Sequence, residues 1–395
     1  MERAELEQIA AETGLAEKHG GYVFLCDPQW TLAQRAAFDA LSQSAVRNSK
    51  SEVSTGWLCL ATGGTGGALK FARHDERTLG AAVTGFCRHF GLQPVNAVGV
   101  LPLHHVSGFM ALLRCRATGG SYLPWDWRKL EAGHRPPIRG GSWTLSLVPT
   151  QLQRLLRSRA ATAWLRRFEL VLIGGGPVWP DLAAAAARAK LRIVLSYGMT
   201  ETAAMITAQT PEEFLAGDRS SGRVLPHGRV RLGRGGVIRV GGRSLFRGYV
   251  GSTARPREHA TGDLGAFDPA GRLRVLGRHD DVIITGGKKV QPALVEAALR
   301  ATGRFSDVAV VGLPHPEWGE EVVACHPPGR KISLAGLRLE ALTAYQRPKR
   351  LLTLPAWPRN AQGKLNRPAV RALALTLTHP RGERGRQRHA FPEAG

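Results

Sequence analysis

The stretch FELVLIGGGPVWPDLAAAAARAKLRIVLSYGMTET, residues 168–202, decides the fold of this chain. A short apolar run ends in three glycines, an alanine-rich segment of helical composition follows, and a second apolar run leads into SYGMTET. Two short apolar strands with a helix between them are typical of a parallel βαβ unit. Ligands of such sheets bind at the carboxyl ends of the strands, so the residues directly after each apolar run are the candidates for chemistry.

The same alternation extends over most of the first two hundred residues. Apolar runs at 57–61, 96–103 and 143–149 are followed by a glycine-rich loop and by helical patterns at 106–118 and 150–157. We expect a further helical segment in MTETAAM, after the run that ends in SYG. This repetition predicts an α/β domain with a doubly wound parallel sheet in which 57–61 is one of the strands.

The pattern changes in the second half of the chain. Short β-like pieces separated by glycines fill residues 221–277, which predicts a small antiparallel β subdomain. After GRHDDVI a new α+β segment follows, with helices expected at 292–303 and 333–345 and strands at 307–314 and 321–327. We predict an N-terminal domain over 1–278, a small C-terminal domain over 281–378, and a basic, disordered tail over 379–395.

Composition restricts the class of protein. No run of eighteen apolar residues and no signal-like N-terminus appears, so we expect no membrane span and a cytoplasmic location. The five cysteines are scattered without metal-binding spacing and are expected to be reduced apolar fillers. The formal net charge of +23 suits polyanions such as nucleic acid, and also nucleotides and coenzyme A. An arginine-rich composition also arises from a GC-biased genome, so charge alone does not choose among these partners.

The segment ATGGTGGALK, residues 61–70, follows a predicted strand. Its four glycines and two threonines can point N–H and O–H groups into one concavity, and its final lysine adds a positive charge, which suits phosphates. The segment lacks the GKS or GKT ending of a Walker loop. Taken alone, it fits a flexible surface turn equally well.

Further segments occur in a fixed order along the chain: GGGP, SYGMTETA, TGD, GRHDD and PRNAQGKLNR. Together with the glycine-rich segment, and over about residues 57–367, they resemble the adenylate-forming superfamily of acyl-CoA synthetases, luciferases and peptide-synthetase adenylation domains. The resemblance implies a large N-terminal domain of doubly wound sheets with a β subdomain, and a small mobile C-terminal domain. It also implies an ATP-dependent acid:CoA ligase that forms an acyl-AMP and then an acyl-CoA, using Mg²⁺.

The resemblance assigns the nucleotide site residue by residue. Thr200 is placed at the α-phosphate, and Glu201 coordinates magnesium. Tyr197 stacks on adenine, with Gly198 and Met199 beside it. The phosphate loop is carried by Thr62, Gly63, Gly64, Thr65, Gly66, Gly67 and Lys70. Gly63, Gly66 and Leu69 depart from the family pattern, which makes this loop looser than usual.

Other positions follow from the same resemblance. Asp263 receives the ribose hydroxyls, with Arg278 beside it, a good match because a carboxylate accepts hydrogen bonds from two vicinal hydroxyls. Lys364 bridges the attacking carboxylate and the α-phosphate, and Asp280 is the hinge of the small domain. Backbone near the adenine and the acyl group comes from Gly174, Gly175, Gly176 and Pro177. Room for the pantetheine arm of coenzyme A comes from Gly286 and Gly287.

The acid pocket is indicated by LPLHHVSGFMALLRCR, residues 101–116, which resembles the o-succinylbenzoate:CoA ligases of menaquinone and phylloquinone synthesis. His105 matches a family histidine and is expected beside the reacting acid. Arg114 lies nine residues further on a predicted helix and is expected, with Ser196, to hold a second carboxylate. Alternatively, His105 is a hydrogen-bonded core residue and Arg114 lies on a solvated face. Only about sixty residues precede the phosphate loop, so part of the family's N-terminal subdomain is expected to be missing or replaced.

Three function classes stay open. The first is the o-succinylbenzoate ligase, and the second is a ligase or carrier-loading enzyme for another aryl or acyl acid. The third is a non-catalytic binder of nucleotides or nucleic acid. The joint presence of Lys364, Glu201 and Asp263 favours catalysis, and we expect no sequence-specific nucleic-acid partner. The sequence leaves the oligomeric state open.

Overall fold

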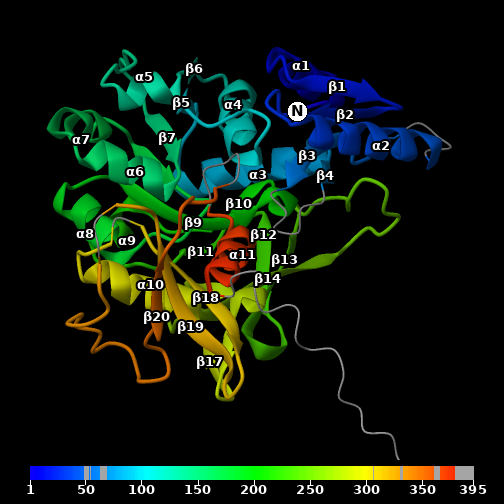
Figure 1. The fold of residues 1–395 in the computed structure, drawn as a ribbon. Helices are drawn as coiled ribbons and strands as arrows, with labels where there is room; N and C mark the ends of the chain where they lie inside the picture. The colour runs from blue at the N-terminus through cyan, green and yellow to red at the C-terminus, as the bar shows by residue number, and fades with distance from the viewer. Residues whose placement is uncertain are drawn as a thin grey trace, which may run out of the picture. The chain divides into compact units, whose positions relative to one another are not determined.

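The computed structural model describes residues 1–48, 53, 55–62, 69–305, 307–329, 332–359 and 365–378. The chain forms two compact units, the first over Met1–Leu276 and the second from Gly277 onward (Figure 1). In the described ranges, no helix combines the length and apolar character that crossing a membrane requires. The predicted tail, 379–395, lies outside the described residues.

The first unit begins with a small four-stranded sheet. Its strands follow the order β1-β2-β3-β4, with β2 parallel to β3 and antiparallel pairing elsewhere. The elements are α1 (Arg3–Glu12), β1 (Ala16–His19), β2 (Tyr22–Leu25), α2 (Leu32–Asn48), β3 (Leu58–Thr62) and β4 (Lys70–His74). Phe24, Phe38 and Phe71 make edge-to-face and tilted ring contacts inside its core.

The placement of β3 corrects one prediction. We expected 57–61 to belong to the doubly wound sheet, but it pairs with β2 and β4 in the separate N-terminal sheet. The reason is local: the chain returns after the glycine-rich segment as an antiparallel strand, with Lys70 opposite Thr62, instead of entering a helix.

A seven-stranded sheet forms the centre of the first unit, in the order β11-β10-β9-β8-β7-β5-β6. Neighbouring strands from β9 to β6 run parallel, whereas β10 is antiparallel to both β9 and β11. The strands are β5 (Asn96–Gly99), β6 (Tyr122–Pro124), β7 (Trp143–Leu147), β8 (Leu170–Ile173), β9 (Ile193–Met199), β10 (Ala204–Ala208) and β11 (Arg223–Val224).

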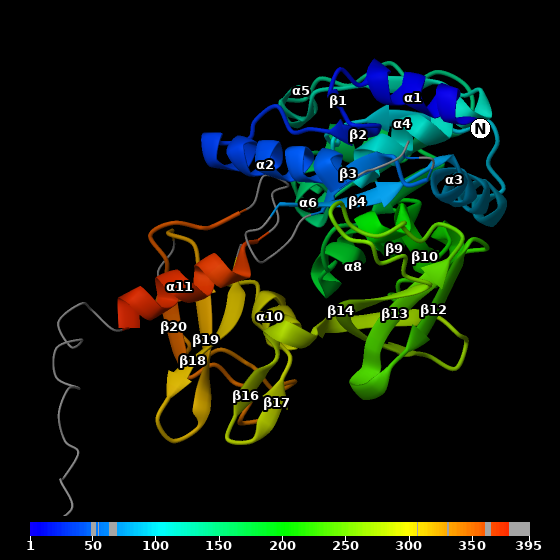
Figure 2. The same ribbon diagram turned by 90° about the vertical axis from the view of Figure 1, so that its right-hand side faces the viewer.

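Helices cover both faces of this sheet, as doubly wound topology requires. One apolar cluster joins alternate residues of β7, β8 and β9 to α6, α7 and α8, and another joins intervening residues of β8 and β9 to α3 (Figures 1 and 2). The helices are α3 (Glu76–Phe90), α4 (Val106–Thr118), α5 (Trp127–Glu131), α6 (Pro149–Leu156), α7 (Arg159–Leu165), α8 (Pro180–Arg188) and α9 (Pro211–Leu215). The predicted α/β fold class is confirmed.

The segment after SYG differs from the predicted helix. It forms a single 3₁₀ turn, η1 (Thr200–Thr202), and then the antiparallel strand β10. Ala203 and Ala204 follow with φ of 53° and 74°, a left-handed conformation that stops a helix and reverses the chain. Thr202 Oγ1 donates a 2.7 Å hydrogen bond to the Ala204 carbonyl inside this reversal.

The predicted β subdomain is present. Its sheet has the order β12-β13-β14-β15, with antiparallel pairing of β12 to β13 and of β13 to β14. The elements are β12 (Gly228–Leu232), η2 (Arg234–Gly236), β13 (Val237–Gly242), β14 (Glu258–Phe267) and β15 (Leu273–Arg278).

The second unit is a small α+β structure. A sheet with the order β17-β16-β19-β18 carries β20 on β19, and α10 and α11 each contribute to an apolar core cluster. The elements are η3 (His279–Asp281), β16 (Ile283–Thr285), β17 (Lys288–Val290), α10 (Pro292–Ala301), β18 (Ala309–His315), β19 (Gly319–His326), β20 (Arg350–Thr353) and α11 (Arg367–Thr378).

The predicted helix over 333–345 is wrong. This segment is a series of turns, with i to i−3 bonds from Leu337 N to Leu334 O and from Leu342 N to Leu339 O. Gly336, inside the first of these turns, has a φ of 78°, which interrupts any helical run. Leu339 and Leu342 are nevertheless buried. The apolar residues whose spacing suggested a helix therefore pack into the core from turns.

Candidate active site

The ends of the glycine-rich segment are fixed by strand pairing. Thr62 closes β3 and lies opposite Lys70, the first residue of β4. The predicted phosphate-loop residues between them lie outside the described residues: Gly63, Gly64, Thr65, Gly66 and Gly67. Lys70 Nζ lies 5.8 Å from the ring centroid of Tyr249.

Thr200 is held by this hairpin. Its hydroxyl donates to the Ala61 carbonyl at 3.4 Å, and its own carbonyl accepts a 2.8 Å hydrogen bond from His74 Nε2. Since a carbonyl only accepts, Nε2 of His74 carries the proton. Burial lowers the pKa of His74 to about 4, so this imidazole is neutral at physiological pH. These two hydrogen bonds connect Thr200, which follows β9, to the hairpin formed by β3 and β4.

Glu201 is buried and is held from a different part of the chain. Its side chain is 4% exposed and accepts a 2.7 Å hydrogen bond from the Tyr249 hydroxyl, while its carbonyl accepts from Phe246 N at 2.9 Å. Burial and the neighbouring Glu201 raise the pKa of the Tyr249 phenol, so Tyr249 stays a donor. One carboxylate completed by substrate phosphates is a common setting for Mg²⁺, so Glu201 fits the magnesium role that the resemblance implied.

Tyr197 and Asp263 meet across two sheets. The Tyr197 hydroxyl, from β9, donates a 2.7 Å hydrogen bond to Asp263 Oδ2, from β14, and Asp263 N donates to Thr261 Oγ1 at 3.1 Å. The structure therefore brings together the two residues that the resemblance placed at adenine and ribose.

The glycine string after β8 lies beside the end of β9. Ser196 Oγ donates to the Ile173 carbonyl at 3.3 Å. A Cβ on Gly174 would lie 3.6 Å from Ser196 Oγ. A Cβ on Gly198 would lie 1.9 Å from the Ala204 carbonyl oxygen, so this position requires glycine. Gly175, Gly176 and Pro177 form the bend between β8 and α8. Met199 is the last residue of β9, and its N–H donates to Thr202 Oγ1 at 3.0 Å.

His105 and Arg114 occupy opposite parts of α4. His105 is the N-cap residue, with its ring 4.1 Å from that of His104. Arg114 is 4% exposed, and its guanidinium carbon lies 4.2 Å from the ring centroid of Phe86. Burial lowers the pKa of Arg114 to about 10. The alternative that Arg114 lies on a solvated face is therefore wrong.

Arg114 is a buried cation with an unusual setting. Its Nε makes no hydrogen bond, and no carboxylate pairs with it in the described part of the chain. His227 lies nearby and is kept neutral, because burial lowers its pKa to about 4. A buried cation without an anion is costly.

The remaining predicted residues lie in the second unit. Arg278 Nη2 lies 3.5 Å from Asp280 Oδ2 in η3. Gly286 and Gly287 are the two turn residues between β16 and β17, with φ of 53° and 73° as a tight primed hairpin turn requires. Lys364 lies outside the described residues, and its flanking residues Arg359 and Leu365 pair as a β-bridge.

Sequence reasoning did not single out Tyr249, His74 or the pair of Asp75 and Arg247. Arg247 Nε lies 2.7 Å from Asp75 Oδ2, and the Asp75 side chain is 1% exposed. This ion pair fixes the segment before Tyr249 to the N-terminus of α3. The partners are 172 residues apart, so their individual patterns give no sign of the contact.

The fold and these strand-end residues define a nucleotide-dependent enzyme with a doubly wound sheet. The family profile for AMP-binding enzymes matches residues 11–250, and the chain belongs to this family of adenylate-forming ligases.

Several named proteins are similar to this chain. The 2-succinylbenzoate–CoA ligase of Oceanobacillus iheyensis is 29% identical over 324 residues, covering 77% of this chain and 67% of that protein. A probable 2-succinylbenzoate–CoA ligase of Mycobacterium tuberculosis is 33% identical over 343 residues, covering 79% and 83%.

Solved structures show the same relationship. The o-succinylbenzoate CoA synthetase (MenE) of Bacillus subtilis, in complex with the acyl-adenylate intermediate OSB-AMP, has a TM-score of 0.71 and 25% identity. The match covers 81% of this chain and 69% of that one. ATP-bound MatB from Rhodopseudomonas palustris has a TM-score of 0.67 and 28% identity, covering 80% and 67%.

Proposed function

We propose that this protein is a 2-succinylbenzoate:CoA ligase of quinone biosynthesis. In the first half-reaction, a carboxylate oxygen attacks the α-phosphorus of ATP and pyrophosphate leaves. In the second, the sulfur of coenzyme A attacks the acyl carbon and AMP leaves. The names of the similar proteins support this reaction, and the buried cation Arg114 is the observation that carries the choice of a dicarboxylic acid.

The first unit supplies the groups that bind and orient ATP in this proposal. Tyr197 offers an aromatic face to adenine, and its hydroxyl orients the Asp263 carboxylate for the ribose hydroxyls. Thr200 and Lys70, linked through the β3–β4 hairpin, lie toward the phosphates. Glu201, oriented by Tyr249, would hold Mg²⁺, which offsets phosphate charge when bound.

Lys364 completes the first half-reaction. A lysine between the attacking carboxylate and the α-phosphate offsets the negative charge that develops there, and electrostatic stabilisation of this kind is often the largest catalytic term. Its motif, PRNAQGKLNR, supports this assignment. Asp280 would be the hinge about which the second unit turns before coenzyme A reacts, with Gly286 and Gly287 beside the pantetheine arm.

The acid lies along α4 in this proposal. His105 and Ser196 would face the reacting end, and Arg114 would hold the distal carboxylate. Nine residues of helix span about 13 Å, and the Arg114 guanidinium lies against Phe86 of α3. The separation suits an aromatic dicarboxylic acid better than a short one.

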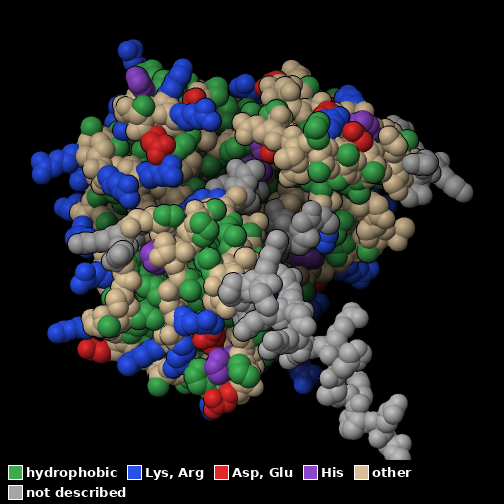
Figure 3. Space-filling model, viewed as in Figure 1, with side chains coloured by type: hydrophobic (Ala, Val, Ile, Leu, Met, Phe, Trp, Pro, Cys, Tyr) green, Lys and Arg blue, Asp and Glu red, His purple; other side chains and the backbone are tan. Residues whose placement is uncertain are grey.

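We infer that the protein works in the cytoplasm without a specific nucleic-acid partner. Its five cysteines are free, and four of them are buried, which suits a reducing compartment. Figure 3 shows Lys and Arg side chains at many separate places on one face, rather than in the stripe typical of nucleic-acid binding.

The test is a substrate screen with ATP, Mg²⁺ and coenzyme A. We expect 2-succinylbenzoate to give pyrophosphate, AMP and a CoA thioester, with kcat/KM at least 100-fold above that of benzoate or a fatty acid. Preference for a monocarboxylic acid would favour another aryl or acyl ligase. Formation of acyl-AMP without thioester would favour a carrier-loading enzyme.

A further inference from the structure

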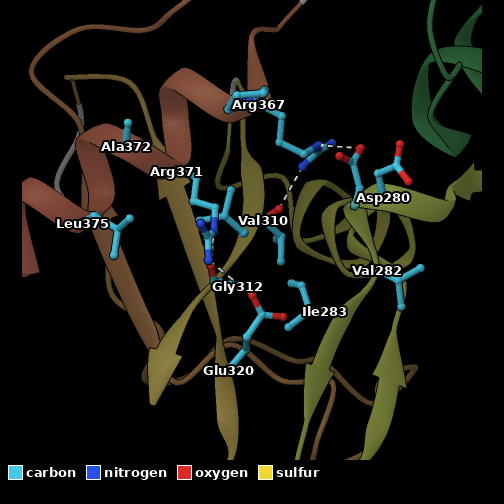
Figure 4. A pocket seen from close by; sticks show the side chains of 13 residues that line it. Asp280, Val282, Ile283, Val310, Gly312, Glu320, Arg367, Arg371, Ala372 and Leu375 are labelled. Atoms are coloured by element: carbon cyan, nitrogen blue, oxygen red, sulfur yellow. Dashed lines mark hydrogen bonds and ion pairs between the residues drawn. The ribbon is translucent and has the colours of Figure 1, made fainter. Parts of the chain in front are cut away.

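Arg367, the first residue of α11, joins three separate parts of the second unit. Its Nε lies 3.1 Å from Asp281 Oδ2 in η3, and its two terminal nitrogens contact both carboxylate oxygens of Glu296, at 2.5 and 3.3 Å. Nη1 also donates to the Val310 carbonyl at 2.8 Å. Figure 4 shows this side chain extending from α11 toward Val310 and the segment that carries Asp280.

Glu296 is the buried centre of this arrangement. Its side chain is 4% exposed, and Oε1 accepts from Val310 N at 2.8 Å as well as from Arg367. Val310 therefore donates to Glu296 and accepts from Arg367, which closes a ring of hydrogen bonds. Because this pair is bidentate, buried and tied to the backbone, its geometry is more restricted than that of a surface ion pair.

The network continues to the other side of the Lys364 segment. Arg300 Nη1 lies 4.0 Å from Glu296 Oε2, and Arg300 Nη2 donates to Asp307 Oδ1 at 3.3 Å. Asp307 Oδ2 in turn accepts from Trp357 Nε1 at 2.8 Å and pairs with Arg359. Charges thus alternate in sign from Asp281 to Arg359.

The two ends of this network flank Lys364 in the chain. Arg359 pairs with Leu365, and Asn366 N donates to the Pro358 carbonyl at 3.0 Å, so residues 358–359 are paired with residues 365–366. Asp307 contacts Arg359, which precedes residues 360–364 in the chain. Arg367, the first residue of α11, follows them and contacts Glu296. Arg367 also contacts Asp281, the neighbour of the proposed hinge residue Asp280.

We propose that Arg367, through Glu296 and Asp281, is a positioning residue that holds the start of α11, which follows Lys364 in the chain, against η3, and that acyl-AMP formation by Lys364 depends on these contacts. This inference rests on the proposed role of Lys364. Arg367 touches neither substrate nor reacting atoms; it sets the position of the residue that does. Its loss therefore acts on the first half-reaction, in which Lys364 works, and not on the second.

The experiment measures the two half-reactions separately in the full chain. For Arg367→Gln we expect the rate of acyl-AMP formation to fall about 30- to 300-fold, with KM for ATP within threefold of wild type. Conversion of pre-made acyl-AMP to thioester should stay within threefold. Arg367→Lys, which keeps the charge but cannot reach three acceptors, should lie between Arg367→Gln and wild type.

Arg371→Gln is the matched control. Arg371 lies one turn further along α11 and lines the same pocket in Figure 4, but it contacts Gly312 O at 2.8 Å and Glu320 at 3.4 Å instead of the network. Both half-reactions should stay within threefold of wild type in this variant. An equal loss in Arg371→Gln and Arg367→Gln would overturn the inference.

A double variant tests the route through Lys364. If Arg367 acts by positioning Lys364, then Arg367→Gln should slow acyl-AMP formation less in a Lys364→Arg background, which keeps the positive charge, than in wild type. Multiplying losses would overturn the inference, as would normal adenylation by Arg367→Gln. If Arg367→Gln does not fold, normal adenylation by Arg367→Lys decides against the inference, and a selective loss supports it. Full adenylation by Lys364→Ala would instead show that the proposed function is wrong in its catalytic residue.

Discussion

The hydroxyl of Tyr249 donates a 2.7 Å hydrogen bond to Oε1 of Glu201, across 48 residues of the chain. The ring of the same tyrosine faces Lys70 at 5.8 Å. One aromatic side chain therefore contacts both the proposed magnesium ligand and the lysine that ends the glycine-rich segment. The relative positions of these two charged groups depend on Tyr249.

The first prediction concerns this hydrogen bond. Tyr249→Phe keeps the ring and removes the donor, and a hydrogen bond to a charged group is worth about 1.5–3 kcal/mol. We expect acyl-AMP formation to slow by about tenfold or more, with a higher Mg²⁺ concentration needed for half-maximal rate. Pyrophosphate release at varied MgCl₂ measures both. Tyr345→Phe, at an exposed tyrosine of the second unit, is the control. An unchanged Mg²⁺ dependence in Tyr249→Phe would contradict the role of Tyr249.

The second prediction separates the two half-reactions. Lys364→Ala should abolish acyl-AMP formation, because the lysine offsets charge on the α-phosphate only in that step. Pre-made acyl-AMP should still be converted to thioester after the second unit has turned about Asp280. Rapid-quench measurements with ATP or with synthetic acyl-AMP distinguish the steps. An equal loss of rate in both half-reactions would contradict the role assigned to Lys364.

The third prediction is a dependence of stability on pH. Burial lowers the pKa of His74 to about 4, whereas an unperturbed histidine titrates near 6.5. Between these values the unfolded chain binds a proton that the folded chain does not, so the free energy of unfolding falls as pH decreases from 6.5 to 4. The shifted pKa of His74 contributes at most about 3 kcal/mol to the free energy of unfolding, and this contribution is fully present above pH 6.5.

Denaturant unfolding between pH 4 and 7.5 measures this effect. His74→Gln keeps a donor for the Thr200 carbonyl but does not titrate, so its stability should depend less on pH than that of wild type over this window. His134→Gln, at an exposed position, is the control and should follow wild type. Parallel pH profiles for wild type and His74→Gln would show that the pKa of His74 is the same in the folded and unfolded states, which contradicts the prediction.

Local patterns were enough to predict strands β5, β7, β8, β9, β18 and β19 and helices α4, α6, α8 and α10. A short motif singled out the residues from Ser196 to Glu201. Each of these depends on apolar periodicity or on a short motif. The errors have separate causes. Ala203 and Ala204 have left-handed backbones that reverse the chain into β10. β3 pairs with β4 in a hairpin and also with the N-terminal strand β2, and this second pairing depends on a distant part of the chain. Tyr249 was missed for the same reason, since its partner lies 48 residues away.

The last prediction concerns the substrate. Arg114 is buried, its Nε makes no hydrogen bond, and its guanidinium lies against Phe86. If it pairs with the distal carboxylate of 2-succinylbenzoate, Arg114→Ala removes a charge-assisted contact worth about 2–4 kcal/mol, and kcat/KM for this acid should fall about 30- to 1000-fold. Slow turnover of benzoate, which lacks the second carboxylate, should change little.

Arg116→Ala is the matched control for this prediction, because Arg116 lies on the same helix but pairs with Glu12 at the surface. It should leave kcat/KM for both acids within threefold. The melting temperature provides a second readout. A buried cation without a paired anion destabilises the ligand-free protein, so Arg114→Met should not lower its melting temperature. A purely structural Arg114 predicts the reverse, a lower melting temperature with 2-succinylbenzoate kinetics unchanged. That result, or a wild-type preference for monocarboxylic acids, would remove the dicarboxylate assignment and leave the adenylating chemistry to be matched with another acid.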